Sequence, residues 1–322
     1  MPDPLIEHEV TMPVTNPDTG RASRSFTFRG KLDWLLPKVH GGKIVDYKTS
    51  ANPMKFLMGQ RLGFQCELYA LAAQQQEGIT IAEWEYRIVT TPSLQIGKMK
   101  KYPTYDAFEA ACYDWLKEKQ ERLITQSVLV NPTKQLQAQH YLWQCGQMIL
   151  TNRRNNIWLP NTNACSDWSR TCEYMPLCLA VANGGDVDWL IEEEFEPKGS
   201  ANPELSNKTL GDKTAITHSS MTTLNRCQLC YHWKFERGLQ PKREESSTAL
   251  WIGSAMHLGM EVFAKDGLDV ALKAITEHTD NTSALGDELK NVQARGCKAR
   301  AMVRAASERW GDNGSESQTT KP

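Results

Sequence analysis

The chain has 322 residues, of which 40% are hydrophobic and 23% are charged, and its formal net charge is -1 at pH 7. These proportions are those of a soluble globular protein with one large domain or two small ones, and the overall charge gives no indication of nucleic-acid binding. No apolar run approaches the roughly 20 residues of a membrane span, and the acidic N-terminal segment lacks a signal-peptide core, so we expect a cytoplasmic protein. A basic surface would have to be local, as at Lys98, Lys100 and Lys101 or over residues 234–243.

Hydrophobic periodicity predicts an α/β fold in the first half of the chain. Strands are expected over residues 5–15, 25–36, 43–49 and 83–91, and helices over residues 59–76, 104–126 and 132–154. The turn signal NPDTG separates the first two strands. The core order is therefore β-β-β-α-β, with further helices attached.

The second half of the chain has a different character. Residues 159–188 are rich in turn formers, and Gly, Pro, Ser and Asn accumulate between residues 183 and 214, as in a linker. Three more helices are expected, over residues 221–233, 247–264 and 284–310. The last residues, 311–322, are predicted to form a disordered tail.

Two carboxylates and an ammonium group stand out in the segment RGKLDWLLPKVHGGKIVDYKTS. Because side chains alternate along a strand, Asp46 and Lys48 point to one face and Tyr47 to the other, and a hairpin would bring Asp33 close to Asp46. This combination suits a hard divalent cation and a polarised water. Each Asp alone is an ordinary strand-end carboxylate, but charges at the end of a core strand are costly unless paired or metal-bound.

The motifs GKLD, VDYKT and Q-C-E-L-Y together resemble the PD-(D/E)XK nuclease superfamily in its RecB-like branch. The resemblance implies a restriction-endonuclease-like fold, a mixed central β-sheet flanked by helices with a helical lobe that carries an Fe–S cluster. It implies that Asp33 and Asp46 hold Mg²⁺ or Mn²⁺, and that Lys48 acts on the attacking water and on the charge of the phosphate. Gln65 and Tyr69 match the Q-x-x-x-Y helix of the branch, which meets substrate.

The branch also uses a metal-binding histidine in a Gly-x-x-x-His context, and this chain has it as GSAMH, with Gly253 and His257. The resemblance adds His257 to Asp33 and Asp46 as a metal ligand, with the carbonyl of Tyr47 as a further one. A lone histidine on a helix with apolar neighbours is, alternatively, a satisfied and partly buried side chain.

The two halves stand in the opposite order to the family, where the Cys helix and the His helix precede the acidic hairpin. We interpret this as a circular permutation, natural or engineered; the alternative is that residues 217–310 form an unrelated helical domain. The expected division is a nuclease core with a three-cysteine segment over residues 1–195, a linker joining former termini over 196–214, a helical segment completing the same domain over 215–310, and a tail over 311–322.

Nine cysteines in an intracellular chain argue against a disulfide framework. Four are expected to be buried thiols, namely Cys66, Cys112, Cys145 and Cys297. The resemblance implies that a [4Fe–4S] cluster is held by Cys227, Cys165, Cys172 and Cys178. A Cys₄ zinc site and free structural cysteines are the alternatives, and Cys230 can replace one of the four because Cys-x-x-Cys is a common zinc half-site.

The expected function is a metal-dependent DNA nuclease, an exonuclease, acting in recombination, repair or end processing in a prokaryotic or viral context. Its partner would be DNA with single-stranded ends, without a membrane. The alternative is a non-catalytic nucleic-acid-binding protein with a zinc-stabilised lobe, which the complete set of Asp33, Asp46, Lys48 and Gln65 argues against. Tyr231 and Trp233 either stack on DNA or pack into the core.

Overall fold

The computed structural model describes residues 4–37, 41–96, 102–166, 171–198, 213–242, 248–282 and 287–311 of the chain. The three lysines Lys98, Lys100 and Lys101, most of the predicted linker and nearly all of the predicted tail lie outside the described residues. No helix within these ranges is both long enough and apolar enough to cross a membrane.

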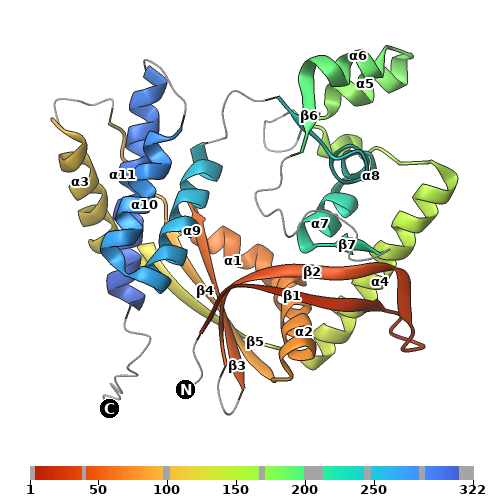
Figure 1. Ribbon diagram of the computed structural model, residues 1–322, viewed down its shortest axis with the longest axis horizontal. Helices are drawn as coiled ribbons and strands as arrows, with labels where there is room; N and C mark the ends of the chain where they lie inside the picture. Colours follow the sequence, from red (N-terminus) through yellow and green to blue (C-terminus); the bar gives the residue numbers. More distant parts are fainter. Residues whose placement is uncertain are drawn as a thin grey trace.

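A mixed sheet forms the centre of the molecule (Figure 1). Its strands are β1 (Leu5–Thr15), β2 (Ala22–Leu36), β3 (Gly42–Ser50), β4 (Ile81–Thr90) and β5 (Leu123–Leu129), side by side in that order. Neighbouring strands are antiparallel except for β3 and β4, which run parallel. The chain between these two strands holds two helices, as a parallel connection requires.

Strand β2 changes its partner along its length. Its first half pairs in parallel with the short strand β7 (Thr214–Ile216), through residues 26–28, whereas residues 34–36 at its end pair with β3. Between these two contacts the same edge of β2 carries no ladder. The acidic residue Asp33 stands at the end of this opening, directly before the pairing with β3 begins.

Helices cover both faces of the sheet. One face packs against α2 (Gln65–Glu77), α4 (Pro132–Asn155) and α7 (His218–Arg226), around residues such as Phe28, Ile44 and Trp84. The other face packs against α9 (Thr248–Asp266) and α11 (Asp287–Trp310), with α3 (Tyr105–Lys117) and α10 (Leu268–Asp280) beside them. The arrangement is consistent with the expected restriction-endonuclease-like fold of helices around a central sheet.

Two predicted helices of the first half are wrong. The helix expected over residues 59–76 is two helices, α1 (Pro53–Leu62) and α2, because Gly63 adopts an extended conformation with ψ of 163° and ends α1. The helix expected over 104–126 ends at Lys117; a short 3₁₀ turn, η1 (Gln120–Arg122), leads into β5. The sequence LITQSVL of β5 alternates and is rich in β-branched residues, which suits an edge strand that pairs with β4.

The second half holds more helix than its turn-rich sequence predicts. Helix α5 (Met175–Asn183) lies in the segment expected to be turns, α6 (Val187–Glu194) lies mostly in the segment expected to resemble a linker, and α10 is a further helix that the sequence does not predict. The helix expected over residues 221–233 breaks at Cys227, which adopts an extended conformation with φ of -164°. The chain continues as α8 (Gln228–Tyr231) and a π-helical turn, η5 (His232–Glu236).

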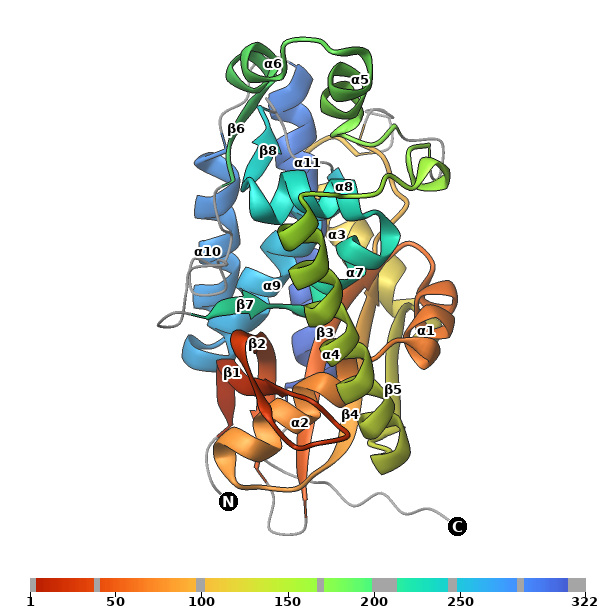
Figure 2. The same cartoon turned by 90° about the vertical axis from the view of Figure 1, so that its right-hand side faces the viewer.

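A separate lobe lies at one end of the molecule, at the top of Figure 2. Strand β6 (Phe195–Pro197) pairs with β8 (Leu239–Pro241) and joins chain segments on either side of the predicted linker. The lobe has a small hydrophobic core of its own, made of Tyr174, Leu177, Leu190, Phe195, Trp233 and Leu239. We call it the cysteine lobe, because Cys172, Cys178 and Cys230 pack against this core.

Candidate active site

The acidic hairpin places Asp33, Asp46 and Lys48 together. Oδ2 of Asp33 accepts the backbone N–H of Tyr47 at 2.7 Å, in the part of the β2 edge that has no ladder. The Nζ atom of Lys48 lies 2.7 Å from Oδ1 of Asp46 and 3.3 Å from the carbonyl oxygen of Tyr47. The two-residue spacing along β3 places both side chains on one face, as strand alternation predicts, and there they form an ion pair.

Burial opposes the charged forms of these three side chains. Asp46 is only 5% exposed, and burial raises its pKa to about 6, against the lowering effect of the Lys48 ammonium. Burial also raises the pKa of Asp33, while Lys48 and the Tyr47 N–H lower it. Burial alone would lower the pKa of Lys48, but the charges of Asp46 and Asp33 raise it above its usual value. The ammonium is therefore held charged between two carboxylates.

One oxygen of this group has no partner. Oδ2 of Asp46 is buried and makes no hydrogen bond to any described residue. A buried carboxylate oxygen without a donor is costly, and a divalent cation is a ligand that would satisfy it. The side chains present therefore fit a hard cation, although within the described ranges no closed set of three or more His, Cys, Asp or Glu side chains has the geometry of a metal site.

The predicted histidine reaches the hairpin from the distant helix α9. The Nδ1 atom of His257 lies 3.5 Å from Oδ2 of Asp33, and α9 contacts both β1 and β3. Burial and the nearby charge of Lys48 lower the pKa of His257 to about 4, so the imidazole is neutral at pH 7. A neutral imidazole beside a carboxylate has a lone pair available for a cation. Gly253 lets the helix approach, since a Cβ there would lie 3.3 Å from the Thr49 hydroxyl.

The Q-x-x-x-Y residues also lie beside the hairpin. Gln65 begins α2 and its side chain hydrogen-bonds to Tyr69, whose pKa burial raises to about 12 with a further contribution from Asp46. The Tyr69 ring stacks on Trp84 at 5.9 Å and covers Gly30 of β2, where a Cβ would lie 2.3 Å from the ring. Gly30 is thus required for Tyr69 to reach this position.

The side chain of Tyr47 faces away from the carboxylates, as strand alternation predicts. Its ring packs against Trp34 at 5.5 Å and Trp310 at 6.0 Å, and its hydroxyl accepts a hydrogen bond of 2.8 Å from Arg87. Arg87 is itself paired with the buried Glu85 at 2.7 Å. This packing fixes the backbone of Tyr47, whose N–H and carbonyl are both used at the site.

Two residues near the site were not singled out from the sequence. Glu7 of β1 lies at the register position opposite Asp33; burial raises the pKa of Glu7, and the charge of Asp33 adds to this rise. His218, the first residue of α7, has its pKa lowered by burial and by the charge of Lys48. Neither follows a motif, because both reach the site through strand pairing of segments far from the hairpin.

The cysteine lobe gathers five thiols. Cys165, Cys172 and Cys227 lie close enough to Cys178 for their charges to act on its pKa, which burial raises to about 11. A hydrogen bond from Cys230 lowers the pKa of Cys172 to about 6. The structure thus places the four predicted cysteines and Cys230 in one region, although no three of them form a metal-binding set within the part of the chain that the structure describes.

The other cysteines behave as the sequence predicts: Cys66, Cys112, Cys145 and Cys297 are buried free thiols. Tyr231 and Trp233 are also buried, at 1% and 4% exposure, so the core alternative is correct and neither ring is available to stack on DNA.

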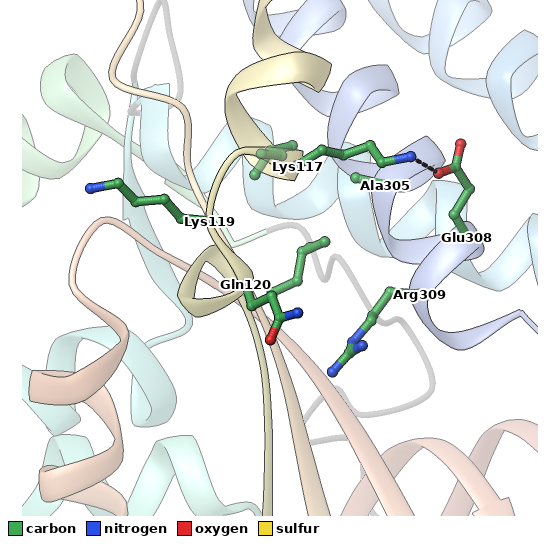
Figure 3. Close-up of a pocket in the computed structure, with 8 residues that line it drawn as sticks. Lys117, Lys119, Gln120, Ala305, Glu308 and Arg309 are labelled. Carbon is green, nitrogen blue, oxygen red and sulfur yellow. Dashed lines mark hydrogen bonds and ion pairs between the residues drawn. The ribbon is translucent and has the colours of Figure 1, made fainter. Parts of the chain in front are cut away.

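A cavity of about 230 Å³ lies elsewhere, between the C-terminal ends of α3 and α11 (Figure 3). Its lining includes Lys117, Lys119 and Arg309 but none of the hairpin residues. Lys117 is engaged by Glu308 at 2.7 Å across the cavity wall. The cavity is therefore separate from the candidate active site.

Comparison with known proteins identifies the family of the chain. The sequence profile described as the PD-(D/E)XK nuclease superfamily matches residues 4–179 and 215–322, and so covers the hairpin, α2 and α9. No match was found among curated proteins or among solved structures. The profile covers well over half of the chain, and the chain therefore belongs to the PD-(D/E)XK nuclease superfamily.

Proposed function

We propose that the protein is a divalent-metal-dependent deoxyribonuclease of the RecB-like type, an exonuclease that acts on DNA ends during recombination, repair or end processing. The observation that carries the proposal is the buried Asp46–Lys48 pair, whose carboxylate keeps one oxygen without a donor among the described residues, beside Asp33 and a neutral His257. Superfamily membership supports nuclease activity in general.

Asp33, Asp46 and His257, with the carbonyl of Tyr47, would hold Mg²⁺ or Mn²⁺. Such an ion, when bound, polarises the phosphate and lowers the pKa of a water for in-line attack on the phosphodiester. Lys48, kept charged by Asp46, would orient that water and stabilise the negative charge that develops on the phosphate. Gln65 and Tyr69, on the adjacent helix, would contact the substrate.

The test is Lys48→Ala, assayed with Mg²⁺ or Mn²⁺ on single-stranded and duplex DNA. We expect the variant to keep its fold and to lose cleavage by at least about 100-fold, because it removes the ammonium at the reacting phosphate. Lys43→Ala is the matched control: Lys43 lies on the same strand and pairs with the buried Glu85 at 2.7 Å. Full cleavage activity of the Lys48 variant would contradict the proposed function, and so would equal losses of activity in the two variants.

The cysteine lobe supports a second part of the proposal, a structural [4Fe–4S] cluster held by Cys165, Cys172, Cys178 and Cys227. Thiolates are soft ligands suited to iron–sulfur clusters and to zinc, so zinc is the rival. The low pKa of Cys172 favours the thiolate that either group needs. The cluster would join the two chain segments of the lobe and take no part in hydrolysis.

We further propose that the two halves of the chain are permuted relative to the family. Support comes from β7, which inserts beside β2, and from α9, which brings His257 to the hairpin from the C-terminal half. The matched residues also fall into two segments, separated by residues 180–214. On this proposal residues 1–195 and 215–310 form one domain, and not a nuclease core with an unrelated helical domain.

A further inference from the structure

Glu7 occupies an unusual position on strand β1. The pairs Ile6–Trp34 and His8–Leu32 flank it, so the register of the two strands places Glu7 opposite Asp33, although these two residues do not themselves form a ladder pair. In an undistorted antiparallel ladder, residues at opposite positions have Cβ atoms about 5 Å apart. Glu7 nevertheless has a φ of +52°, in the left-handed region that a glutamate in a strand avoids. The backbone is therefore distorted at the residue that faces a candidate metal ligand.

The carboxylate of Glu7 is held by one lysine. Lys31 Nζ lies 2.7 Å from Oε2 of Glu7, diagonally across the ladder, and both side chains are 21% exposed. Glu7 also acts electrostatically on His257, in the direction opposite to burial and Lys48. Glu7 is thus near enough to Asp33 and His257 for its charge to interact with both side chains.

The next step along the same ladder gives an internal comparison. Arg29 pairs with Glu9 at 2.7 Å, diagonally, in the same way as Lys31 pairs with Glu7. Glu9 lies opposite Lys31 and has no metal-ligand candidate opposite it. The positive φ and the neighbouring Asp33 distinguish Glu7 from Glu9.

We propose that Glu7 is a third carboxylate of the centre formed by Asp33, Asp46 and His257, neutralised by Lys31 in the cation-free protein and contributing to the hold on a divalent cation. The inference rests on the proposed function, since it assumes that the hairpin binds a cation. Oδ2 of Asp46 is buried and has no hydrogen-bond partner among the described residues, so it marks where the cation would bind. The carboxylate of Glu7 would add to the negative charge around that cation.

Titration calorimetry of Mn²⁺ into the full chain, without DNA, tests this role. We expect Glu7→Gln to weaken Mn²⁺ binding by about tenfold or more, the usual effect of losing a supporting carboxylate at a metal site. Lys31→Met should tighten binding, because it removes the cation that competes for Glu7. Glu9→Gln, the matched control, should leave the affinity within about twofold of the unchanged protein.

Two outcomes would overturn the role of Glu7. One is an Mn²⁺ affinity of Glu7→Gln within about twofold of that of the unchanged protein. The other is an equal loss of Mn²⁺ affinity in Glu7→Gln and Lys31→Met, which would indicate a purely structural pair. Glu7→Gly is a second variant that removes the carboxylate, and because glycine tolerates the positive φ, it keeps the strand intact. Asp46→Asn distinguishes a failure of the Glu7 role from a failure of the hairpin centre. If it binds Mn²⁺ as tightly as the unchanged protein, the hairpin centre itself is wrong; if it alone loses binding, only Glu7 is excluded.

Discussion

The carboxylate of Asp33 takes the place of a ladder hydrogen bond by accepting the backbone N–H of Tyr47 at 2.7 Å. It does so where β2 has left β7 and has not yet joined β3, so the strand edge is open. Asp33 is thereby anchored through one oxygen to the strand that carries Asp46 and Lys48. The consequence is that the packing of Tyr47 determines where both carboxylates lie.

Replacing Trp310 tests this dependence on packing. Trp310 packs on the ring of Tyr47 at 6.0 Å and donates a hydrogen bond of 2.9 Å to the hydroxyl of Thr125. We expect Trp310→Ala to lower the free energy of unfolding by about 3–5 kcal/mol and to weaken Mn²⁺ binding, because the cavity lets the Tyr47 backbone move. Trp310→Phe keeps an aromatic ring and should cost less in both measurements. Unchanged Mn²⁺ affinity in a folded Trp310→Ala protein would contradict the link.

Gly30 is a second position where packing supports the site. A Cβ there would lie 2.3 Å from the Tyr69 ring, so Gly30→Ala must displace that ring. We expect a loss of about 1–3 kcal/mol in the free energy of unfolding, measured by urea denaturation, as is usual for overpacking. Gly59→Ala, in the exposed part of α1 with nothing within 4 Å, is the control and should stabilise the protein by about 0.5–1 kcal/mol.

Displacement of the Tyr69 ring also predicts that the stability losses of Gly30 and Tyr69 variants do not add up. In the double variant Gly30→Ala with Tyr69→Leu, the smaller side chain leaves room for the new methyl group. The double variant should therefore be more stable than the sum of the two single losses indicates. Strict additivity would show that Gly30 and Tyr69 do not constrain each other.

The lowered pKa of the buried Glu85 leads to a prediction of how the free energy of unfolding depends on pH. Its hydrogen bonds to Lys43 and Arg87 lower its pKa below 4.5 in spite of burial. A lowered pKa in the folded state means that the stabilisation is complete above the unfolded pKa and is lost as pH falls through the folded one. The stability difference between the unchanged protein and Glu85→Gln should therefore be largest at neutral pH and shrink in acid.

Urea denaturation at a series of pH values measures this difference. Glu118→Gln is the control, because Glu118 is paired with Arg122 but its side chain is 66% exposed, and exposed pairs contribute little. A difference between the unchanged protein and Glu85→Gln that grows as pH falls would have the wrong sign and would refute the assignment.

The cysteine lobe predicts a visible chromophore. Protein purified without oxygen should show the broad charge-transfer absorption of an iron–sulfur cluster, with iron in the purified sample. Cys172→Ser should lose both the absorption and the iron, since Cys172 has the thiol with the lowered pKa in the lobe. Cys66→Ser is the control, because Cys66 is buried beside Tyr86, outside the lobe. Zinc without visible absorption in anaerobic protein would favour the zinc alternative.

Serine variants of Cys178 and Cys230 decide which of them completes the set. Loss of iron with Cys178→Ser but not with Cys230→Ser would support the four predicted ligands. The reverse result would replace Cys178 by Cys230 and would leave the proposed lobe intact.

The chain sequence by itself determined the chemistry of the hairpin. Strand alternation puts Asp46 and Lys48 on one face, and this rule depends only on local backbone geometry. The same holds for the strands β1, β2, β3 and β4, whose hydrophobic patterns are continuous. Hydrophobic periodicity was insufficient where the chain changes structure within a few residues. Gly63 divides the periodic segment 59–76 into two helices, and β5 follows α3 after one 3₁₀ turn.

The tertiary structure decided which distant segments join the hairpin. The motif around His257 indicated a metal ligand, but only the packing of α9 on the sheet brings its ring to 3.5 Å from Asp33. Glu7 had no motif at all and is placed by antiparallel register, which depends on pairing between strands and not on the residues within one. The five clustered thiols depend likewise on β6 pairing with β8 across the predicted linker, a contact between remote parts of the chain that no local pattern encodes.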